Sequence, residues 1–337
     1  MPLGLPRLRL SRRRFLQSSA AFAGAVLTTH RASSAPLETL RLDYAYYNPV
    51  ALVLKEKGWA DEEFGKTGTK VEWVLSLGSN KALEFLNGAA VDFGSSAGSA
   101  ALMARANDIP IKAVYIYSRP EWTALVTTKD SPIHKVEDLR GKRVAVTRGT
   151  DPHIFLLRAL DRFGLSTPDI KMVLLQHPDG KTALVRGDVD AWAGLDPYMA
   201  QTELEDGSRL FFRDPNLNTY GFLNTREVFA HEHPDEVLRV LQVYERGRQW
   251  ALANPDGLRD ILAKAAKLTA PVAAKELERT DLRNPVIGEE HRAAIIAAGG
   301  VLKKAEVVPA STDIPAVAGQ LIDTQFVTKL GLKAAAK

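Results

Sequence analysis

Polar residues follow two short strands that the sequence predicts about a hundred residues apart. The strand Val91–Gly94 is followed by the polar segment Ser95–Ser99, and the similar strand Val189–Ala193 is followed by Asp196. A short helical segment that ends at a glycine precedes each strand. Open α/β sheets bind ligands at the carboxyl ends of their strands. The repeated pattern therefore predicts two matched lobes with a binding cleft between them.

The first polar segment offers hydrogen-bond donors that suit a small anion. Ser95, Ser96 and Ser99 carry hydroxyl groups, and the segment leads into a helix whose first backbone N–H groups are free to bind an oxyanion. The alternative is a tight turn between strand and helix, in which the serines only cap the helix. Because a second, similar segment exists, we keep both interpretations.

A further anion site is predicted where Gly149 and Thr150 precede another helix. Glycine permits close approach of the backbone, and the amide and hydroxyl of Thr150 lie at the positive end of the helix dipole. Pro152 removes one amide donor, so fewer remain for a ligand. The favoured role for Asp151 is to cap this helix, and the alternative is an ion pair with an ammonium group of the ligand.

Four more residues are candidates for the ligand shell. Arg119 and Trp122 lie where the chain is expected to cross between lobes, so the cation could pair with an anionic head group and the ring could cover an apolar tail. An exposed hinge with a packed tryptophan is the alternative. Tyr46 and Asn48 follow the first strand, although aromatic residues at such a position are as often part of the core.

Signals for catalysis are scarce. The chain has no cysteine, which excludes disulfides, thiolate metal sites and cysteine nucleophiles. His231 and His233 cannot share a helix face at a spacing of two, so no metal site is predicted there. No familiar catalytic or nucleotide-binding motif is present. We therefore expect a protein that is not an enzyme and that binds no cofactor and no metal.

The N-terminus is typical of an export signal. Ser11–Gln17 matches the twin-arginine pattern, and the Ala-rich stretch Ser18–Thr29 is too short and too weakly apolar to span a bilayer. Small residues at 32–35 predict cleavage there, so residues 1–35 are expected to be the signal and the mature protein to be periplasmic and soluble.

Removing the signal changes the charge balance. The whole chain has 44 basic and 40 acidic residues, and residues 1–35 contain six arginines and no acid. The mature chain then has 44 − 6 = 38 basic and 40 acidic residues, a net charge of −2. The basic character therefore belongs to the signal, and nothing indicates nucleic acid as a partner.

From Leu40 onward, predicted strands and helices alternate in both halves, which is typical of mainly parallel α/β sheets covered on both faces. The first lobe is expected at 36–122 and 222–337, including a helical C-terminal run, and the second lobe at 123–221. Trp122–Thr128 and Gly221–Thr225 would be the strands at which the chain passes between the lobes.

At this level the chain resembles a known family. The resemblance rests on Asp130–Ile133, Val136–Val146, Gly149-Thr150, Gly187–Trp192 and Asp196–Tyr198. These segments are similar to those of the solute-binding proteins of sulfonate, nitrate and taurine ABC importers, above all the aliphatic sulfonate-binding branch. The resemblance covers about residues 38–250 well. It departs from the pattern at Ala97–Ser99 and at Asp151, where an Asn is more usual.

The resemblance implies a monomer with a two-lobed periplasmic-binding-protein type II fold. Its lobes would be joined by a two-strand hinge, close on a small anion such as an alkanesulfonate, and dock on a membrane permease. The segments matching Ser95–Ser99, Gly149-Thr150 and Asp196-Pro197 would line the cleft. Alternatives are a binder of taurine, nitrate or an aromatic sulfonate, and an enzyme similar to thiamine-pyrimidine synthases, which share the fold.

Overall fold

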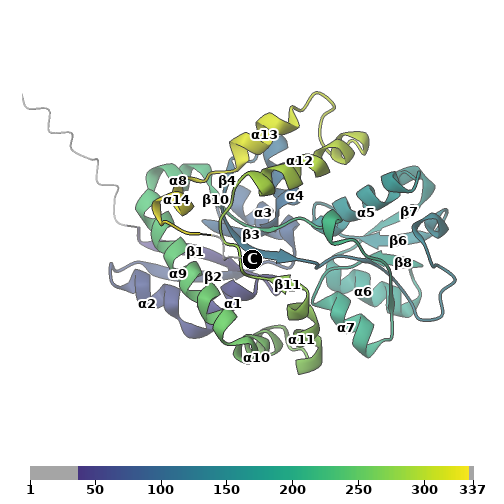
Figure 1. Cartoon of the computed structure of the whole chain (residues 1–337), viewed down its shortest axis with the longest axis horizontal. Helices are drawn as coiled ribbons and strands as arrows, with labels where there is room; N and C mark the ends of the chain where they lie inside the picture. The colour runs from purple at the N-terminus through teal and green to yellow at the C-terminus, as the bar shows by residue number, and fades with distance from the viewer. Residues whose placement is uncertain (1–36, 334–337) are drawn as a thin grey trace, which may run out of the picture. The chain divides into compact units, whose positions relative to one another are not determined.

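The computed structural model describes residues 37–333, which fold around two β-sheets (Figure 1). The first sheet has the order β11-β4-β10-β3-β1-β2 and the second the order β7-β6-β8-β5-β9. The strands of the first sheet are β1 Thr39–Tyr44, β2 Lys70–Leu75, β3 Phe93–Ala97, β4 Ile111–Pro120, β10 Gly221–Arg226 and β11 Thr280–Asp281. Those of the second are β5 Leu125–Thr127, β6 Arg143–Val146, β7 Lys171–Leu174, β8 Ala191–Ala193 and β9 Arg209–Phe212.

Two connections join the sheets, one from β4 to β5 and one from β9 to β10. The predicted two-lobed architecture with a two-strand hinge is confirmed. Each sheet is mixed: β1, β2 and β3 pair in parallel, as do β6, β7 and β8, whereas β10 and β5 pair antiparallel with their neighbours. The antiparallel strands arise because a chain that crosses to the other lobe and returns must reverse its direction.

Helices cover both sheets. Around the first sheet lie α1 Pro49–Lys57, α2 Trp59–Gly65, α3 Ser79–Asn87, α4 Gly98–Ala106, α8 Glu227–Glu232, α9 Pro234–Ala253, α10 Pro255–Ala266, α13 Ile314–Leu321 and α14 Gln325–Lys329. The second sheet carries α5 Asp151–Arg162, α6 His177–Arg186 and α7 Tyr198–Glu205. Short 3₁₀ turns occur at Val136–Leu139, Thr167–Asp169 and Pro215–Leu217.

Two C-terminal helices connect the lobes outside the hinge. Helix α11 (Ala270–Glu278) packs on α7 of the second lobe. Helix α12 (Glu289–Lys304) packs on α4 and α13 of the first lobe and on α5 of the second (Figure 1). The C-terminal run was expected to pack back on the first lobe alone. The structure shows that α11 and α12 of this run also pack on helices of the second lobe.

Local sequence explains where the helices near the cleft begin. Asn48 accepts a hydrogen bond from the backbone N–H of Ala51 at 3.1 Å, and Pro49 occupies the first helical position, so this local sequence sets the start of α1. Gly58 ends α1 in the left-handed conformation at φ 66°. Helices α2, α8, α13 and α14 were not predicted.

The polar segment Ser95–Ser99, predicted to be a loop after the strand, is not a loop. Residues 95–97 belong to strand β3, and α4 begins directly at Gly98. Ser95 pairs with Leu223 and Ser96 with Phe222 on the antiparallel strand β10. Serine and glycine favour turns in isolation, but this pairing supplies the backbone hydrogen bonds of a strand. Its partner is so distant in sequence that no local pattern reveals it.

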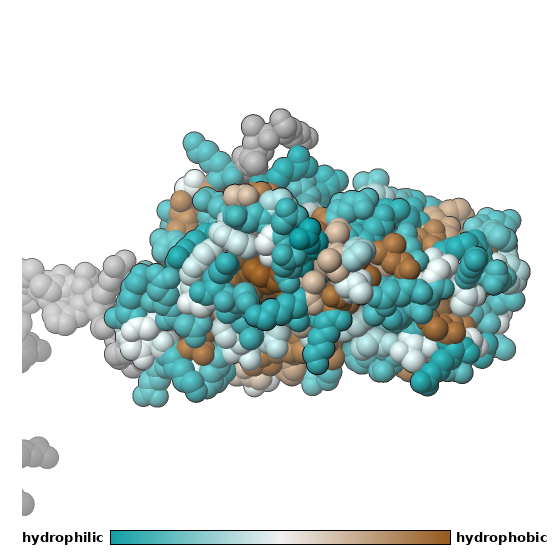
Figure 2. All heavy atoms as spheres, turned by 90° about the horizontal axis from the view of Figure 1, so that it is seen from below, coloured by the Kyte–Doolittle hydropathy of each residue, from teal (hydrophilic) through white to brown (hydrophobic). Residues whose placement is uncertain are grey.

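The apolar core is continuous through the first lobe and its helices, whereas the second lobe has one apolar cluster on each face of its sheet. Figure 2 shows one face of the molecule, on which hydrophilic residues dominate and hydrophobic residues form small separate patches. None of the helices in residues 37–333 is both long and apolar enough to cross a membrane.

Adjacent glycines in α12 give a matched test of packing between this helix and α13. A Cβ at Gly299 would lie 2.3 Å from Cγ2 of Ile314, whereas a Cβ at Gly300 would meet nothing within 4 Å. We expect Gly299→Ala to lower the free energy of unfolding by about 1–3 kcal/mol through overpacking. Gly300→Ala should raise it by about 0.5–1 kcal/mol because alanine favours the helix. Urea unfolding of both variants checks this, and equal effects would contradict it.

Candidate functional site

A buried carboxylate lies where the two lobes and both hinge connections meet. Asp151, the first residue of α5, accepts hydrogen bonds from the Ser99 hydroxyl at 2.6 Å and from the Trp122 indole N–H at 2.8 Å. It also accepts from the hydroxyl and backbone N–H of Thr219 at 2.8 and 2.9 Å. Ser99 belongs to the first lobe, and Trp122 and Thr219 belong to the two connections. The interaction joins all of these segments.

These bonds replace the roles expected for Asp151 from sequence. The cap position of α5 is Thr150, and no side chain caps this helix end, so the predicted capping role is wrong. An ionised carboxylate accepts about four hydrogen bonds, and the protein supplies four, which leaves no acceptor position for a ligand ammonium. Ser99, expected to donate to an external anion, donates to Asp151 instead.

Ser95 and Ser96 are also committed within the protein. The amide and the hydroxyl of Ser95 donate to the two oxygens of Asp43, both at 2.8 Å, and its hydroxyl accepts from the amide of Asn48 at 2.8 Å. The Ser96 hydroxyl accepts from Asn224 at 2.9 Å. All five side chains are buried, and burial raises the pKa of Asp43 to about 6. This network lies beneath the cleft, so we leave Ser95, Ser96 and Asn48 out of the proposed ligand shell.

The remaining predicted residues divide into two groups. Tyr46 is half-buried, and Gly149 brings its backbone against the first lobe, because a Cβ there would lie 3.3 Å from Cε of Met103. Thr150 is buried beside it and donates its hydroxyl to the Thr147 carbonyl at 2.7 Å. These three residues lie on the ligand side of their strands, where α1 and α5 begin.

Arg119 and Trp122 lie at the hinge. Arg119 is exposed, with its guanidinium 5.9 Å from the ring centroid of Tyr220. Trp122 is buried, and its ring packs edge-on against Tyr47 with 5.7 Å between centroids. The arrangement matches the alternative given above, an exposed hinge cation with a packed tryptophan. Arg119 is therefore not included in the proposed shell, and Trp122 acts by positioning Asp151.

Further polar side chains, not predicted from the sequence, lie where helices begin at or near the seam between the lobes. Asn80 Oδ1, Gln176 Oε1, His153 Nδ1 and both ring nitrogens of His177 are buried without a hydrogen-bond partner in the protein. Asn80 lies at the start of α3, and the other three lie at the starts of α5 and α6. The signal that would have revealed Asn80, Gln176 and His177 is their place after strands β2 and β7, by the same rule that selected Asp196.

Two tyrosines add hydroxyl groups to this seam. Tyr198 begins α7 in the second lobe, and Tyr46 follows β1 in the first. Burial raises the pKa of Tyr198 to about 12, and the neighbouring Tyr46 hydroxyl contributes to the shift. Both phenols therefore remain neutral at physiological pH and can donate hydrogen bonds to an anion.

Asp196 does not face a ligand as a free carboxylate. It accepts the backbone N–H of Ala200 at 2.8 Å and pairs with the guanidinium of Arg279 at 3.4 Å. Arg279 also pairs with Glu203, and Glu276 lies buried close by with one oxygen unpartnered. One cation thus meets three carboxylates between α11 and α7. Burial raises the pKa of Asp196 to about 7 and that of Glu276 well above its usual value.

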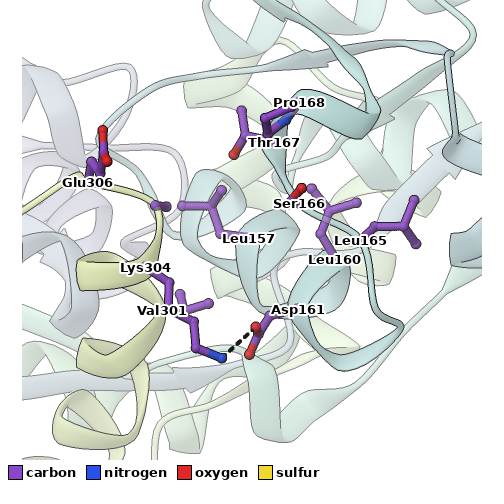
Figure 3. Close-up of a pocket in the computed structure, with 11 residues that line it drawn as sticks. Leu157, Leu160, Asp161, Leu165, Ser166, Thr167, Pro168, Val301, Lys304 and Glu306 are labelled. Carbon is purple, nitrogen blue, oxygen red and sulfur yellow. Dashed lines mark hydrogen bonds and ion pairs between the residues drawn. The ribbon is translucent and has the colours of Figure 1, made fainter.

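A separate cavity of about 460 Å³ lies between α5 and α12 (Figure 3). Leu157, Leu160 and Val301 line it, and Lys304 pairs with Asp161 beside it at 2.8 Å. Residues in the C-terminal half of α5 line the cavity, whereas Asp151 lies at the other end of that helix. It is therefore distinct from the seam, and it contains none of the residues predicted to bind ligand.

No group of three or more His, Asp or Glu side chains in residues 37–333 is placed to hold a metal ion. The seam offers neutral hydrogen-bonding groups and helix N-termini, which can bind an oxyanion through several hydrogen bonds.

The role of Asp151 can be tested by Asp151→Asn, which places an amide N–H₂ group among four donors. We expect a loss of about 1–3 kcal/mol in the free energy of unfolding, because buried donors lose their partner. Asp161→Asn, at the other end of α5, removes only an exposed ion pair and should cost at most about 1 kcal/mol. Chemical denaturation measures both. Equal losses would show that Asp151 does not organise the hinge.

The carboxylates around Arg279 predict a pH dependence of stability. A raised pKa means that the native state binds protons more strongly than the unfolded chain, so the stabilising protonated form is lost as pH rises. We expect Glu276→Gln to make the free energy of unfolding fall less steeply between pH 5 and 8, by up to about 1.4 kcal/mol per pH unit. Exposed Glu278→Gln on the same helix is the control. An unchanged slope in Glu276→Gln would refute the expectation.

Comparison with known proteins agrees with the geometry. The NMT1/THI5 like family model matches residues 50–258. A Bacillus subtilis (strain 168) protein named "Putative aliphatic sulfonates-binding protein" is 28% identical over 242 residues, which cover 71% of this chain and 73% of the relative. A more distant match, 24% identical over 262 residues, is the 4-amino-5-hydroxymethyl-2-methylpyrimidine phosphate synthase of Aspergillus parasiticus, with 71% of this chain and 75% of the synthase covered.

Solved structures share the fold. The periplasmic aliphatic sulphonate binding protein of Escherichia coli is 27% identical with a TM-score of 0.70, and the match covers 82% of this chain and 90% of that one. The alkanesulfonate-binding protein of Xanthomonas axonopodis pv. citri bound to MOPS matches at 24% identity and a TM-score of 0.77, over 86% of this chain and 100% of that one. The two-lobed architecture is thus the periplasmic-binding-protein fold. The chain belongs to the NMT1/THI5-like family and is similar to aliphatic sulfonate-binding proteins.

Proposed function

We propose that this chain is the solute-binding component of an ABC importer that binds an aliphatic sulfonate between its lobes and delivers it to a membrane permease. The observation that carries the proposal is the seam, where buried polar atoms of side chains from both lobes lack hydrogen-bond partners within the protein. Burying polar groups without partners is costly, so these groups favour a polar ligand that hydrogen-bonds to both lobes.

The chemistry of the seam suits a sulfonate. Helices α3 and α6 begin there from opposite lobes, and helix N-termini favour negative charge. A sulfonate oxygen only accepts hydrogen bonds, so the amide N–H₂ groups of Asn80 and Gln176 and the phenol of Tyr198 would be its donors, as would the phenol of Tyr46. The unpartnered amide oxygens of Asn80 and Gln176 would accept from water or from a ligand amine. Neutral donors bind an oxyanion without a full counter-charge, which permits release. Gly149 and Thr150 complete the proposed shell by their position beside Met103 and Asn80.

Ser99, Trp122 and Asp196 serve the site indirectly. The first two hold Asp151 at the hinge, and Asp196 connects α7 to Arg279. A ligand that contacts both lobes favours closure in proportion to its differential affinity for the closed state. Delivery to a permease would follow from recognition of that closed state.

Export completes the proposal. The twin-arginine pattern at Ser11–Gln17 and the cleavage expected near residues 32–35 lie outside the described residues. Relatives described as periplasmic support export. We propose that the chain leaves the cytoplasm by the twin-arginine route and acts as a monomer in the periplasm.

The competing class is an enzyme related to the pyrimidine phosphate synthase. The cysteine-rich motif expected of such enzymes is impossible in a chain without cysteine, and binding proteins match more strongly than the synthase does. Native mass spectrometry of the purified protein separates the possibilities, because a carried sulfonate and a carried pyrimidine phosphate differ in mass.

Ligand-induced stabilisation is the direct test. Butanesulfonate at 100 times its dissociation constant should stabilise the mature protein by about 2.7 kcal/mol and raise its melting temperature. Taurine, nitrate and benzenesulfonate, each at the same millimolar concentration, distinguish the alternatives within the class. Sodium chloride at matched ionic strength is the control. If none of these ligands raises the melting temperature, the proposed function is wrong.

A further inference from the structure

One of the contacts between the lobes joins a glycine and a histidine. A Cβ built on Gly78, which precedes α3 of the first lobe, would lie 3.0 Å from Nε2 and 3.1 Å from Cδ2 of His177 in the second lobe. The imidazole therefore lies directly against the Gly78 backbone, with no room for an anion between them. The contact belongs to the closed arrangement of the lobes, because Gly78 directly precedes α3 and His177 begins α6, and these helices begin on opposite sides of the seam.

The ring of His177 is fully buried, and neither nitrogen has a hydrogen-bond partner. Burial alone lowers its pKa to about 3, so the closed lobes hold it neutral. It is also the first residue of α6, where the helix dipole further disfavours a cation.

Charged groups near His177 do not explain this neutrality. The ionisable side chains on α6 and on the helices α7 and α3 are Asp179, Lys181, Arg186, Tyr198, Glu203, Glu205, Lys81 and Glu84, and Asp206 follows α7 directly. Lys181 pairs with Asp206 at 3.8 Å and Lys81 with Glu84 at 2.7 Å. On the sheet beneath α6, Arg143 pairs with Asp190 at 3.2 Å. None of these groups is among the causes of the shift.

We propose that His177 is a proton-sensitive seal of the binding cleft: the lobes close on ligand only while its imidazole is neutral, and protonation favours the open lobes and release. The inference rests on the proposed function and concerns the regulation of that same site. When the lobes separate, water reaches the ring and its pKa returns toward the ordinary value of about 6.5. The closed state has the lower pKa, so closure is favoured above pH about 6.5 and lost progressively as pH falls below it.

Calorimetric titration with butanesulfonate tests the seal, because a sulfonate does not titrate in this range. We expect the dissociation constant of the wild-type protein to rise about tenfold from pH 7.5 to pH 5.5, the factor given by an open-state pKa of about 6.5. The side chain in His177→Gln is neutral at both pH values. The dissociation constants of this variant at pH 7.5 and pH 5.5 should therefore agree within about twofold.

A further variant separates His177 from other titrating groups. His231→Gln, at an exposed histidine on α8, should keep the wild-type pH dependence. Affinity that is unchanged or tighter at pH 5.5 in the wild type would overturn the proposal, since tighter binding would mean that an imidazolium pairs with the ligand. Failure to bind at pH 7.5 would instead refute the proposed function.

Gly78 gives an independent test of the contact. Its φ of 172° is extended backbone that alanine adopts readily, so Gly78→Ala should fold normally. The added methyl group would lie 2.8 Å from Oδ1 of Asn80 in its own lobe, a contact that this flexible side chain can relieve, and it meets the buried His177 ring once the lobes close. We expect about tenfold weaker binding at pH 7.5 from overpacking against the ring. In a His177→Ala background, Gly78→Ala should cause little further loss. If the two losses multiply, the residues do not meet across the seam and the proposal is wrong.

Discussion

The structure depends on one buried carboxylate. Asp151 comes from the second lobe, and its four donors come from the first lobe and from both hinge connections. Removing a carboxylate from water is expensive unless hydrogen bonds compensate, and here every acceptor position is used. The same group that fixes the hinge therefore also occupies Ser99, so an external ligand must bind elsewhere along the seam.

The C-terminal helices add a second set of contacts between the lobes. Helix α11 brings Arg279 to Asp196 and Glu203 of the second lobe, and α12 brings Lys304 to Asp161. The contacts around Arg279 are buried and include more carboxylates than cations, whereas the pair of Lys304 and Asp161 is exposed and contributes little to stability. Motion of the lobes must accommodate both sets, so the hinge strands alone do not determine how far the lobes open.

These constraints shape the binding surface. With the serines and two aspartates engaged beneath it, the seam presents neutral amides, phenols and imidazoles at helix N-termini. Such a surface suits a singly charged oxyanion and supports the receptor function proposed here. It also makes the cost of closing sensitive to what occupies the seam, because groups without partners become buried there. In the proposed function, the residues that recognise the ligand would therefore also regulate closure.

The sequence by itself determined the alternation of strands and helices, the beginning of α1 at Asn48 and Pro49, the two lobes and the family. These features follow from local capping and from periodicity, which act over a few residues. Only the tertiary structure decided that Ser95 and Ser96 lie in a strand, that Asp151 faces the hinge, and that His177 meets Gly78. Each of these depends on a partner far away in the chain. A local pattern reveals that a side chain is polar, whereas folding determines which group satisfies it.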